Sequence, residues 1–153
     1  MVNREIGSEF WNNFESNNLE KGSYKAVPKW MQLGKEQKLL LAGRTAIDFV
    51  LEDISKTKNV RSVYMPSYCC SSMLQPFIDR GIKIVIYNVV SDDEGLVYQI
   101  NYNISTDIFF ATSYFGYQST TMDNVIKKFL NKDIIVIEDI THRLLSKPNH
   151  CFK

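Results

Sequence analysis

The stretch 134-IIVIEDITH-142 decides the fold class of this sequence. Apolar residues fill 134–137, and the carboxylates Glu138 and Asp139 follow them. A continuous apolar run is typical of a strand that is buried on both faces, as in a parallel sheet. Open α/β sheets bind ligands at the carboxyl ends of their strands, so Asp139 is a candidate functional residue. Its apolar flanks favour a cationic or N–H partner, because desolvation of a lone carboxylate is costly. The alternative is a capped strand end with solvated carboxylates.

The length, composition and net charge of the chain limit the classes of protein to which it can belong. The chain has 153 residues, is 44% hydrophobic and 23% charged, and carries a formal net charge of +1. These values are typical of one soluble globular domain, and they argue against nucleic acid as a partner. No stretch approaches the ~18 consecutive apolar residues of a membrane span, and the N-terminus has no apolar signal-peptide core. We therefore expect a cytoplasmic protein without a membrane partner.

The apolar pattern alternates between helical and strand periods along the chain. Helical spacing predicts helices over 44–54, 69–80 and 121–131. Strands are predicted over 60–65, 83–90, 107–113 and 133–137, with a short extended piece over 96–100. Pro76 either kinks the second helix or marks its first turn. This alternation predicts a three-layer α/β/α fold with a mostly parallel sheet and helices on both of its faces.

Gly43-Arg44-Thr45-Ala46 opens the first predicted helix. Free N–H groups in a first helical turn, a hydroxyl and a guanidinium together form a natural anion site. The alternative is a glycine turn with a capping hydroxyl on Thr45 and a solvated Arg44.

Pro66-Ser67-Tyr68-Cys69-Cys70-Ser71 follows the first predicted strand, where this architecture holds ligands. Tyr68 could stack on a planar ring, and Ser67 or Ser71 could cap the next helix. The alternative is a strand-to-helix turn with buried thiols.

The cysteines are Cys69, Cys70 and Cys151. An odd count with an adjacent pair is a poor disulfide framework, and the spacing fits no usual zinc site. We expect three reduced thiols and no metal. A cysteine nucleophile is not expected, because no general base lies nearby in the sequence.

Tyr114-Phe115-Gly116-Tyr117 follows the strand predicted over 107–113. Gly116 would allow a ligand to approach the backbone closely. An aromatic lid over the core is an equally good interpretation.

Four of these segments, in this order, resemble the N-terminal part of the DegT/StrS-like sugar-nucleotide aminotransferases. That family consists of pyridoxal-phosphate (PLP) enzymes of fold type I. The matching segments are 43-GRTA-46, 64-YMPSY-68, 114-YFG-116 with Asp123 after it, and 137-IEDITH-142. The similarity runs from about Gly7 to about Leu145.

The resemblance implies PLP as the cofactor. Thr45 and Ala46 match the family's phosphate-binding turn, with Arg44 as an additional ligand. Asp139 matches the carboxylate that pairs with the pyridinium nitrogen, and His142 matches a residue close to the cofactor.

The sequence departs from the family at Cys70, where an aromatic residue commonly stacks on the cofactor ring. Tyr68 could replace that aromatic residue only if the loop were shifted. The family's Schiff-base lysine lies beyond another strand, past the equivalent of residue 153. Lys147 and Lys153 do not stand in such a context, so we expect no catalytic residue in this chain.

The resemblance thus implies a truncated aminotransferase-like protein that is inactive alone, with an amino-sugar nucleotide as substrate of the full-length form and a role in polysaccharide biosynthesis. Residues 1–37 would form an arm of short helices and irregular chain, and residues 38–153 an incomplete PLP-binding domain. Two alternatives remain: one half of a split aminotransferase, and a non-enzymatic α/β scaffold that binds a partner. An exposed sheet edge favours a homo-oligomer or a missing C-terminal half as the partner.

Overall fold

A five-stranded sheet in the order β3-β2-β1-β4-β5 forms the centre of the computed structural model, which describes residues 38–93, 95–115 and 120–143. The strands are β1 (Ser62–Pro66), β2 (Lys83–Asp92), β3 (Gly95–Gln99), β4 (Ile108–Thr112) and β5 (Ile135–Asp139). The helices are α1 (Gly43–Ser55), α2 (Ser71–Asp79), α3 (Thr120–Leu130) and the short 3-10 helix η3 (Thr141–Arg143). All neighbouring strands are parallel except β2 and β3, which pair antiparallel. The predicted fold class is confirmed.

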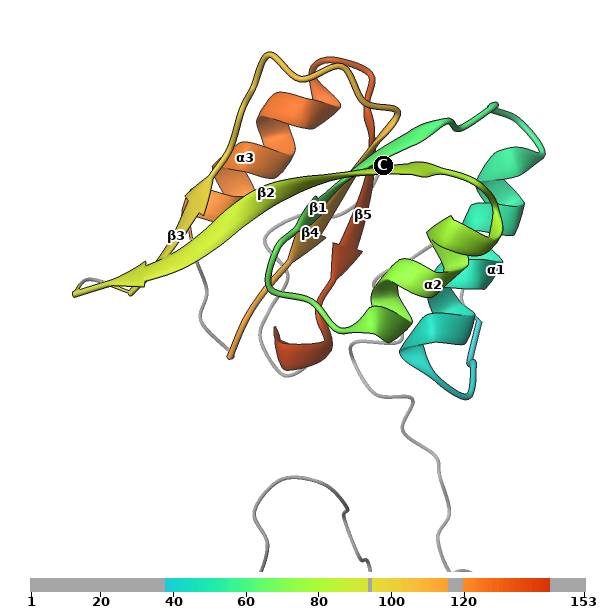
Figure 1. Cartoon of the computed structure of the whole chain (residues 1–153), viewed down its shortest axis with the longest axis horizontal. Coiled ribbons are helices and arrows are strands. Elements are labelled where there is room, and N and C mark those ends of the chain that lie inside the picture. Colours follow the sequence, from blue (N-terminus) through green and yellow to red (C-terminus); the bar gives the residue numbers. More distant parts are fainter. Residues whose placement is uncertain (1–37, 94, 116–119, 144–153) are drawn as a thin grey trace, which may run out of the picture.

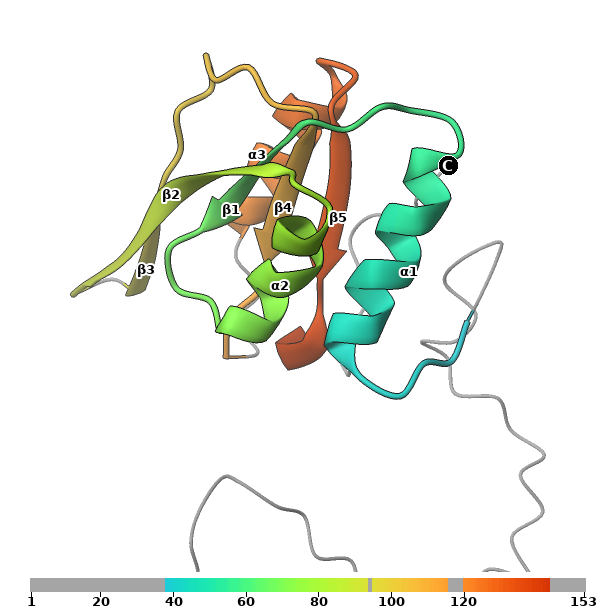
Figure 2. The same cartoon turned by 45° about the vertical axis from the view of Figure 1, so that its right-hand side comes forward.

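The two faces of the sheet carry separate cores, because successive side chains of a strand point to opposite faces. On one face, Val63 and Met65 of β1 pack with apolar residues of α1 and α2. On the other face, Tyr64 and Phe109 pack with apolar residues of α3. Figures 1 and 2 show α1 and α2 together on one side of the sheet and α3 on the other. Burial on both faces explains why these strands are continuous apolar runs.

The topology creates a switch point between β1 and β4, which are neighbours in the sheet. From β1 the chain runs through α2 to β2 on one side, and from β4 it runs through α3 to β5 on the other side. Adjacent strands that lead in opposite directions leave a crevice at their carboxyl ends, where open α/β sheets bind ligands. Figure 2 shows the N-terminal ends of α1 and α2 at the same end of the sheet as η3.

The structure corrects the predicted starts of β5 and α2. Strand β5 begins at Ile135 rather than at Asp133, because Asp133 adopts a left-handed conformation with φ of 58° after α3. Glu138 and Asp139 pair with Ala111 and Thr112 of β4, so they are the last two residues of the strand rather than residues that follow it. Helix α2 begins at Ser71, and Pro76 lies inside it rather than in its first turn.

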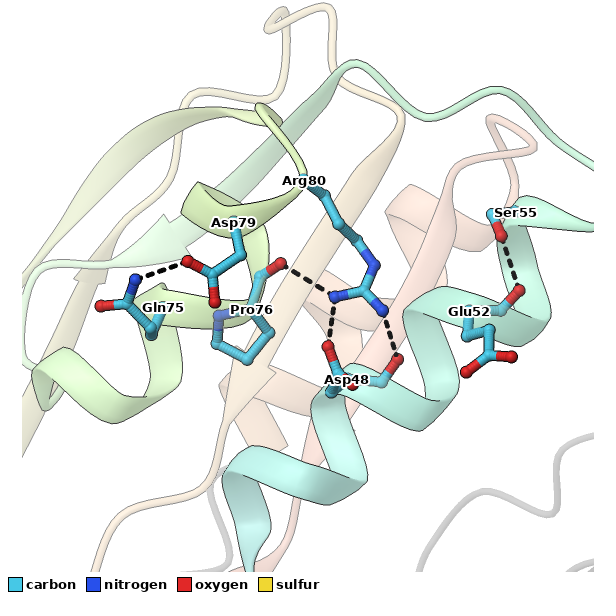
Figure 3. Close-up of polar contacts among 7 residues, drawn as sticks. All are labelled: Asp48, Glu52, Ser55, Gln75, Pro76, Asp79 and Arg80. Carbon is cyan, nitrogen blue, oxygen red and sulfur yellow. Dashed lines mark hydrogen bonds and ion pairs between the residues drawn. The ribbon is translucent and has the colours of Figure 1, made fainter.

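Arg80 joins α2 to α1 (Figure 3). Its guanidinium pairs with the Asp48 carboxylate, donates to the Asp48 carbonyl at 3.2 Å, and donates to the Pro76 carbonyl at 3.2 Å. The last bond satisfies one of the carbonyls that the end of a helix leaves free. This contact fixes how the two helices lie against each other, and both helices begin at the switch-point end of the sheet.

Among the described helices, none is long and apolar enough to cross a membrane. The arm predicted for residues 1–37 lies outside the described residues, as do Gly116, Tyr117, Lys147, Cys151 and Lys153.

Candidate functional site

Two adjoining clefts lie at the carboxyl ends of β1, β4 and β5. The first, the strand-end cleft, has a volume of about 420 Å³ and is walled by residues from 67–73, 112–114 and 139–142. The second, the α1 cleft, has a volume of about 650 Å³ and lies between the start of α1 and the end of β5. Both are lined by Cys70, Asp139 and His142. We therefore treat them as one candidate site with two compartments.

Asp139 is held in a fixed orientation at the end of β5. Its Oδ1 accepts hydrogen bonds from the Thr141 backbone N–H at 2.9 Å and from the Thr141 hydroxyl at 2.6 Å. Its carbonyl accepts the Ser113 N–H at 3.1 Å. Within the described residues, Oδ2 accepts no hydrogen bond, so this oxygen can receive a donor from a ligand in the cleft.

Thr112 lies directly opposite Asp139 in the register between β4 and β5. Its side chain is 5% exposed and lines the strand-end cleft. Its hydroxyl has no hydrogen-bond partner within the described part of the chain. The hydroxyl oxygen is closed to solvent and lies against the Tyr114 phenol, so it sits behind the wall of the cleft rather than in it.

His142 is anchored to the turn that follows β4. Its Nδ1 accepts the Phe115 backbone N–H at 3.1 Å, and the two rings stack with centroids 5.8 Å apart. A hydrogen bond of this kind requires an unprotonated Nδ1, so the ring proton of the neutral imidazole is on Nε2. Phe115 has φ of 55° and a side chain that is 63% exposed. Left-handed backbone at a bulky residue is uncommon and clusters at functional sites.

Tyr114 closes the floor of the strand-end cleft. Its hydroxyl donates to the Tyr68 carbonyl, and its side chain is buried. Burial raises the pKa of the Tyr114 phenol well above its usual value, so the hydroxyl remains a donor at neutral pH. The Tyr68 ring packs edge-to-face on Tyr114 with centroids 5.4 Å apart and is itself 60% exposed. Tyr114 lines the strand-end cleft, whereas Phe115 lines neither cleft, and the two interpretations of this aromatic turn both stay predictions because Gly116 lies outside the described residues.

The segment after β1 places Cys70 at the N-cap of α2, with no side-chain capping hydrogen bond. The predicted capping by Ser67 is wrong: its hydroxyl accepts the Val89 N–H at 3.0 Å and so ties the turn to β2. Ser71 is the first helical residue and does not cap α2 either.

Helix α1 starts at Gly43 after Ala42, again without a side-chain cap. Gly43, Arg44 and Ala46 line the α1 cleft, whereas Thr45 is exposed and is not among the lining residues. The uncapped first turn offers N–H groups and the positive end of the helix dipole to this compartment.

The roles predicted for the site residues stay predictions, but the structure shows which of these residues lie together. The site brings together six of the residues singled out from the sequence: Arg44, Ala46, Tyr68, Cys70, Asp139 and His142. Sequence reasoning missed Thr112 and Thr141, which position or complement Asp139. The spacing Asp139-x-Thr141 could have predicted the role of Thr141, because an Asp side chain often accepts a hydrogen bond from the backbone N–H two residues later. Among the described residues, no lysine lines either cleft.

Three solved structures that are similar to this chain contain PLP. A PLP-bound protein from Clostridium difficile 630, assigned as an aminotransferase, superposes with a TM-score of 0.56 at 14% identity, over 83% of this chain and 39% of that protein. The PLP-bound C-S lyase from Staphylococcus hominis gives a TM-score of 0.49 at 8% identity, over 72% of this chain and 32% of the lyase. Cystalysin from Treponema denticola, which contains PLP, gives 0.49 at 12% identity, over 72% and 32%.

The first of these similarities shows the fold: the described sheet and helices match a fragment of the PLP-dependent transferase fold. The chain spans 39% of the length of that protein. No protein-family model and no curated protein matches the sequence.

Proposed function

We propose that this chain forms the part of a PLP-dependent enzyme that holds the pyridine ring and the phosphate of the cofactor. The observation that carries this proposal is the arrangement of Asp139, which lines the strand-end cleft, has Oδ1 fixed by Thr141, and accepts no hydrogen bond at Oδ2 from the described residues. A carboxylate in this position accepts a hydrogen bond from a protonated ring nitrogen and keeps that nitrogen protonated. When bound, PLP supplies an electron sink through its protonated ring.

The residues around Asp139 fit a planar, polar ligand. The Thr112 hydroxyl beside it is buried against the Tyr114 phenol and makes no regular hydrogen bond within the described residues. His142 is fixed by Phe115, so its imidazole presents an Nε2–H donor. Tyr68 offers an exposed aromatic face at the rim. The site therefore has polar groups for ring substituents and a flat surface for the ring.

We place the phosphate at the start of α1. The helix has 13 residues and no side-chain cap, so its first N–H groups and its dipole favour an anion. Arg44 lies in this turn and lines the compartment, and it adds a positive charge. Thr45 is outside the cleft lining, so its hydroxyl is the weakest member of the proposed phosphate turn.

The reaction class is transamination of a sugar nucleotide, as the resemblance to the DegT/StrS-like family implies. No lysine of the described residues lines either cleft, so the covalent attachment of the cofactor is assigned to no residue here. The described residues would hold PLP through hydrogen bonds and charge. A lysine outside them would be needed for complete chemistry.

The test is a spectroscopic titration of the full chain with PLP. Asp139→Asn should weaken binding by about tenfold or more, since a hydrogen bond to a charged group is worth about 1.5–3 kcal/mol. Glu138→Gln, a carboxylate change at the neighbouring position, should leave the affinity within about twofold. Equal effects of the two variants would remove Asp139 from its role. After borohydride treatment we expect no pyridoxyl group on the chain, and a lysine-linked group at a single site would contradict non-covalent binding.

A partner-binding scaffold is the second candidate function. Within the described residues, β5 pairs with β4 on one side and with nothing on the other. An open edge strand offers unpaired N–H and carbonyl groups to another strand, from a second copy or from a separate polypeptide that completes the enzyme. Light scattering tests this: we expect an oligomer, and a clean monomer would count against an accessible edge.

A further inference from the structure

His142 extends the connection between β4 and β5 beyond the last residue pair of the sheet. The register of the two strands ends at Thr112 and Asp139, and the Ser113 N–H then donates to the Asp139 carbonyl at 3.1 Å. Two residues further along, the Phe115 N–H donates to Nδ1 of His142 at 3.1 Å. A titratable side chain thus takes the place that a backbone carbonyl would have in a continuing ladder.

This hydrogen bond exists only while the imidazole is neutral. Nδ1 needs a free lone pair to accept the Phe115 N–H, whereas both ring nitrogens of an imidazolium are donors. Histidine is the side chain whose charge ordinarily changes between about pH 5 and 8. Both His142 and Phe115 are exposed, so a proton can reach Nδ1 from solvent.

The backbone of Phe115 makes the loss of this bond consequential. Its φ of 55° lies in the left-handed region, which bulky residues rarely adopt and which persists only where the surroundings hold it. His142 holds it through the Nδ1 bond and through the stacking of the two rings, whose centroids are 5.8 Å apart. An imidazolium also favours an aromatic face, so the ring contact survives protonation, but it does not require this backbone orientation.

We propose that His142 is a pH-sensitive latch on the turn that follows β4: the neutral imidazole holds the left-handed turn at Phe115, and protonation at Nδ1 releases it. Tyr114, the preceding residue, lines the strand-end cleft, so release of the turn alters a wall of the candidate site. The shape of this wall then follows the pH of the surroundings. The latch operates in the chain without ligand and does not depend on PLP.

Several titratable groups face the same clefts as His142 and form its electrostatic surroundings. A neighbouring carboxylate favours a protonated imidazole and a guanidinium disfavours it, so the titration of the ring itself has to be measured. These groups are Glu138 and Asp139 on β5, Tyr114 after β4, Tyr68, Cys69 and Cys70 before α2, and Arg44 at the start of α1.

The experiment follows the Phe115 amide and the His142 ring together in NMR spectra of the full chain, over about pH 5 to 8. His150→Gln is the background, so that His142 is the only histidine. The chemical shift of the Phe115 amide should change with the same midpoint as the ring resonances. Its protection from hydrogen exchange, relative to the intrinsic rate, should fall by about three- to tenfold on protonation, as expected for the loss of one hydrogen bond. The Arg61 amide, which donates to Asp107 at 2.9 Å, is the control and should not change.

Two substitutions separate the hydrogen bond from the ring contact. His142→Asn places a carbonyl oxygen that does not titrate near the position of Nδ1, so the Phe115 amide should stay protected over the whole range. His142→Phe keeps an aromatic ring without an acceptor, so this amide should be unprotected even at the alkaline end. Three results would overturn the proposal: a Phe115 amide that ignores the titration of the ring, a neutral ring with its proton on Nδ1, or full protection of this amide in the Phe variant.

Discussion

Thr112 and Asp139 are register partners at the carboxyl ends of β4 and β5, and their side chains lie on the same face of the sheet. The Asp139 carboxylate is oriented by Thr141, whereas the Thr112 hydroxyl is buried without a partner in the described part of the chain. Leaving a buried polar group unpaired costs about 1–3 kcal/mol. The buried Thr112 hydroxyl therefore destabilises the ends of these strands slightly.

Thr112→Val should raise the free energy of unfolding by about 1 kcal/mol, because it replaces the unpaired hydroxyl with a methyl group of similar size. The same change should leave PLP affinity within about twofold, because the hydroxyl oxygen is closed to the cleft. Urea unfolding and the PLP titration measure the two effects. Thr112→Ser, which keeps the hydroxyl, is the control and should not gain stability. A destabilised Val variant would show that the hydroxyl has a partner in the folded chain.

Thr141→Val should loosen Asp139 without unfolding the protein. It removes the 2.6 Å hydrogen bond from the Thr141 hydroxyl to Oδ1 and keeps the backbone N–H bond. Because Thr141 is exposed, we expect a change in melting temperature of no more than about 2 °C. PLP affinity should fall by about threefold, less than for Asp139→Asn. Thr141→Ser should restore it, and an unchanged affinity for the Val variant would show that Thr141 does not position the carboxylate.

Asp107→Asn should make stability less dependent on acid pH. Burial raises the pKa of Asp107, but hydrogen bonds to its Oδ2 from the backbone N–H groups of Arg61 and Ser62 and from the Ser62 hydroxyl, each 2.9 Å, bring it below its usual value. A carboxyl group whose pKa is lowered in the folded state stabilises the protein above its unfolded-state pKa of about 3.9.

That stabilisation is lost as the pH falls through the folded-state pKa of Asp107. The variant should therefore unfold more easily than the unsubstituted chain at neutral pH, and the difference should shrink as the pH falls below the unfolded-state pKa and through the lower folded-state pKa of Asp107. Thermal unfolding across this range, with exposed Asp53→Asn as the control, provides the measurement. A difference that does not vary with pH would show that the charge of Asp107 contributes nothing.

Arg80→Met should destabilise the pairing of α1 with α2 by about 1–2 kcal/mol, because it removes the ion pair with Asp48 and two hydrogen bonds to backbone carbonyls (Figure 3). Lys56→Met is the matched control. It breaks only the 3.1 Å pair with Asp53, whose two side chains are 62% and 69% exposed, and should cost no more than about 0.5 kcal/mol. Denaturant unfolding measures both variants, and equal losses would mean that the Arg80 contacts act only as a surface pair.

The apolar runs predicted the strands and the layering, because burial on both faces leaves a direct mark in the sequence. The end of β5 was less predictable: the left-handed turn at Asp133 shifts the strand and brings Asp139 into it. Thr112 could not be singled out, because its importance follows from the register between two strands. The exposed position of Thr45 follows from where α1 begins, since successive helical residues point in directions about 100° apart.

The bond between Ser62 and Asp107 joins residues 45 apart in the sequence. The pairing of β1 with β4 that it accompanies therefore closes a long loop containing α2, β2 and β3. Contacts with such separation form late in folding, because the entropy of loop closure must be overcome before they stabilise the chain. The cleft draws its walls from both strands and from β5, so it cannot exist in a partly folded intermediate. Ligand binding to this protein would then report that folding is complete. In a refolding experiment, the ligand-binding signal should therefore appear later than the helix signal.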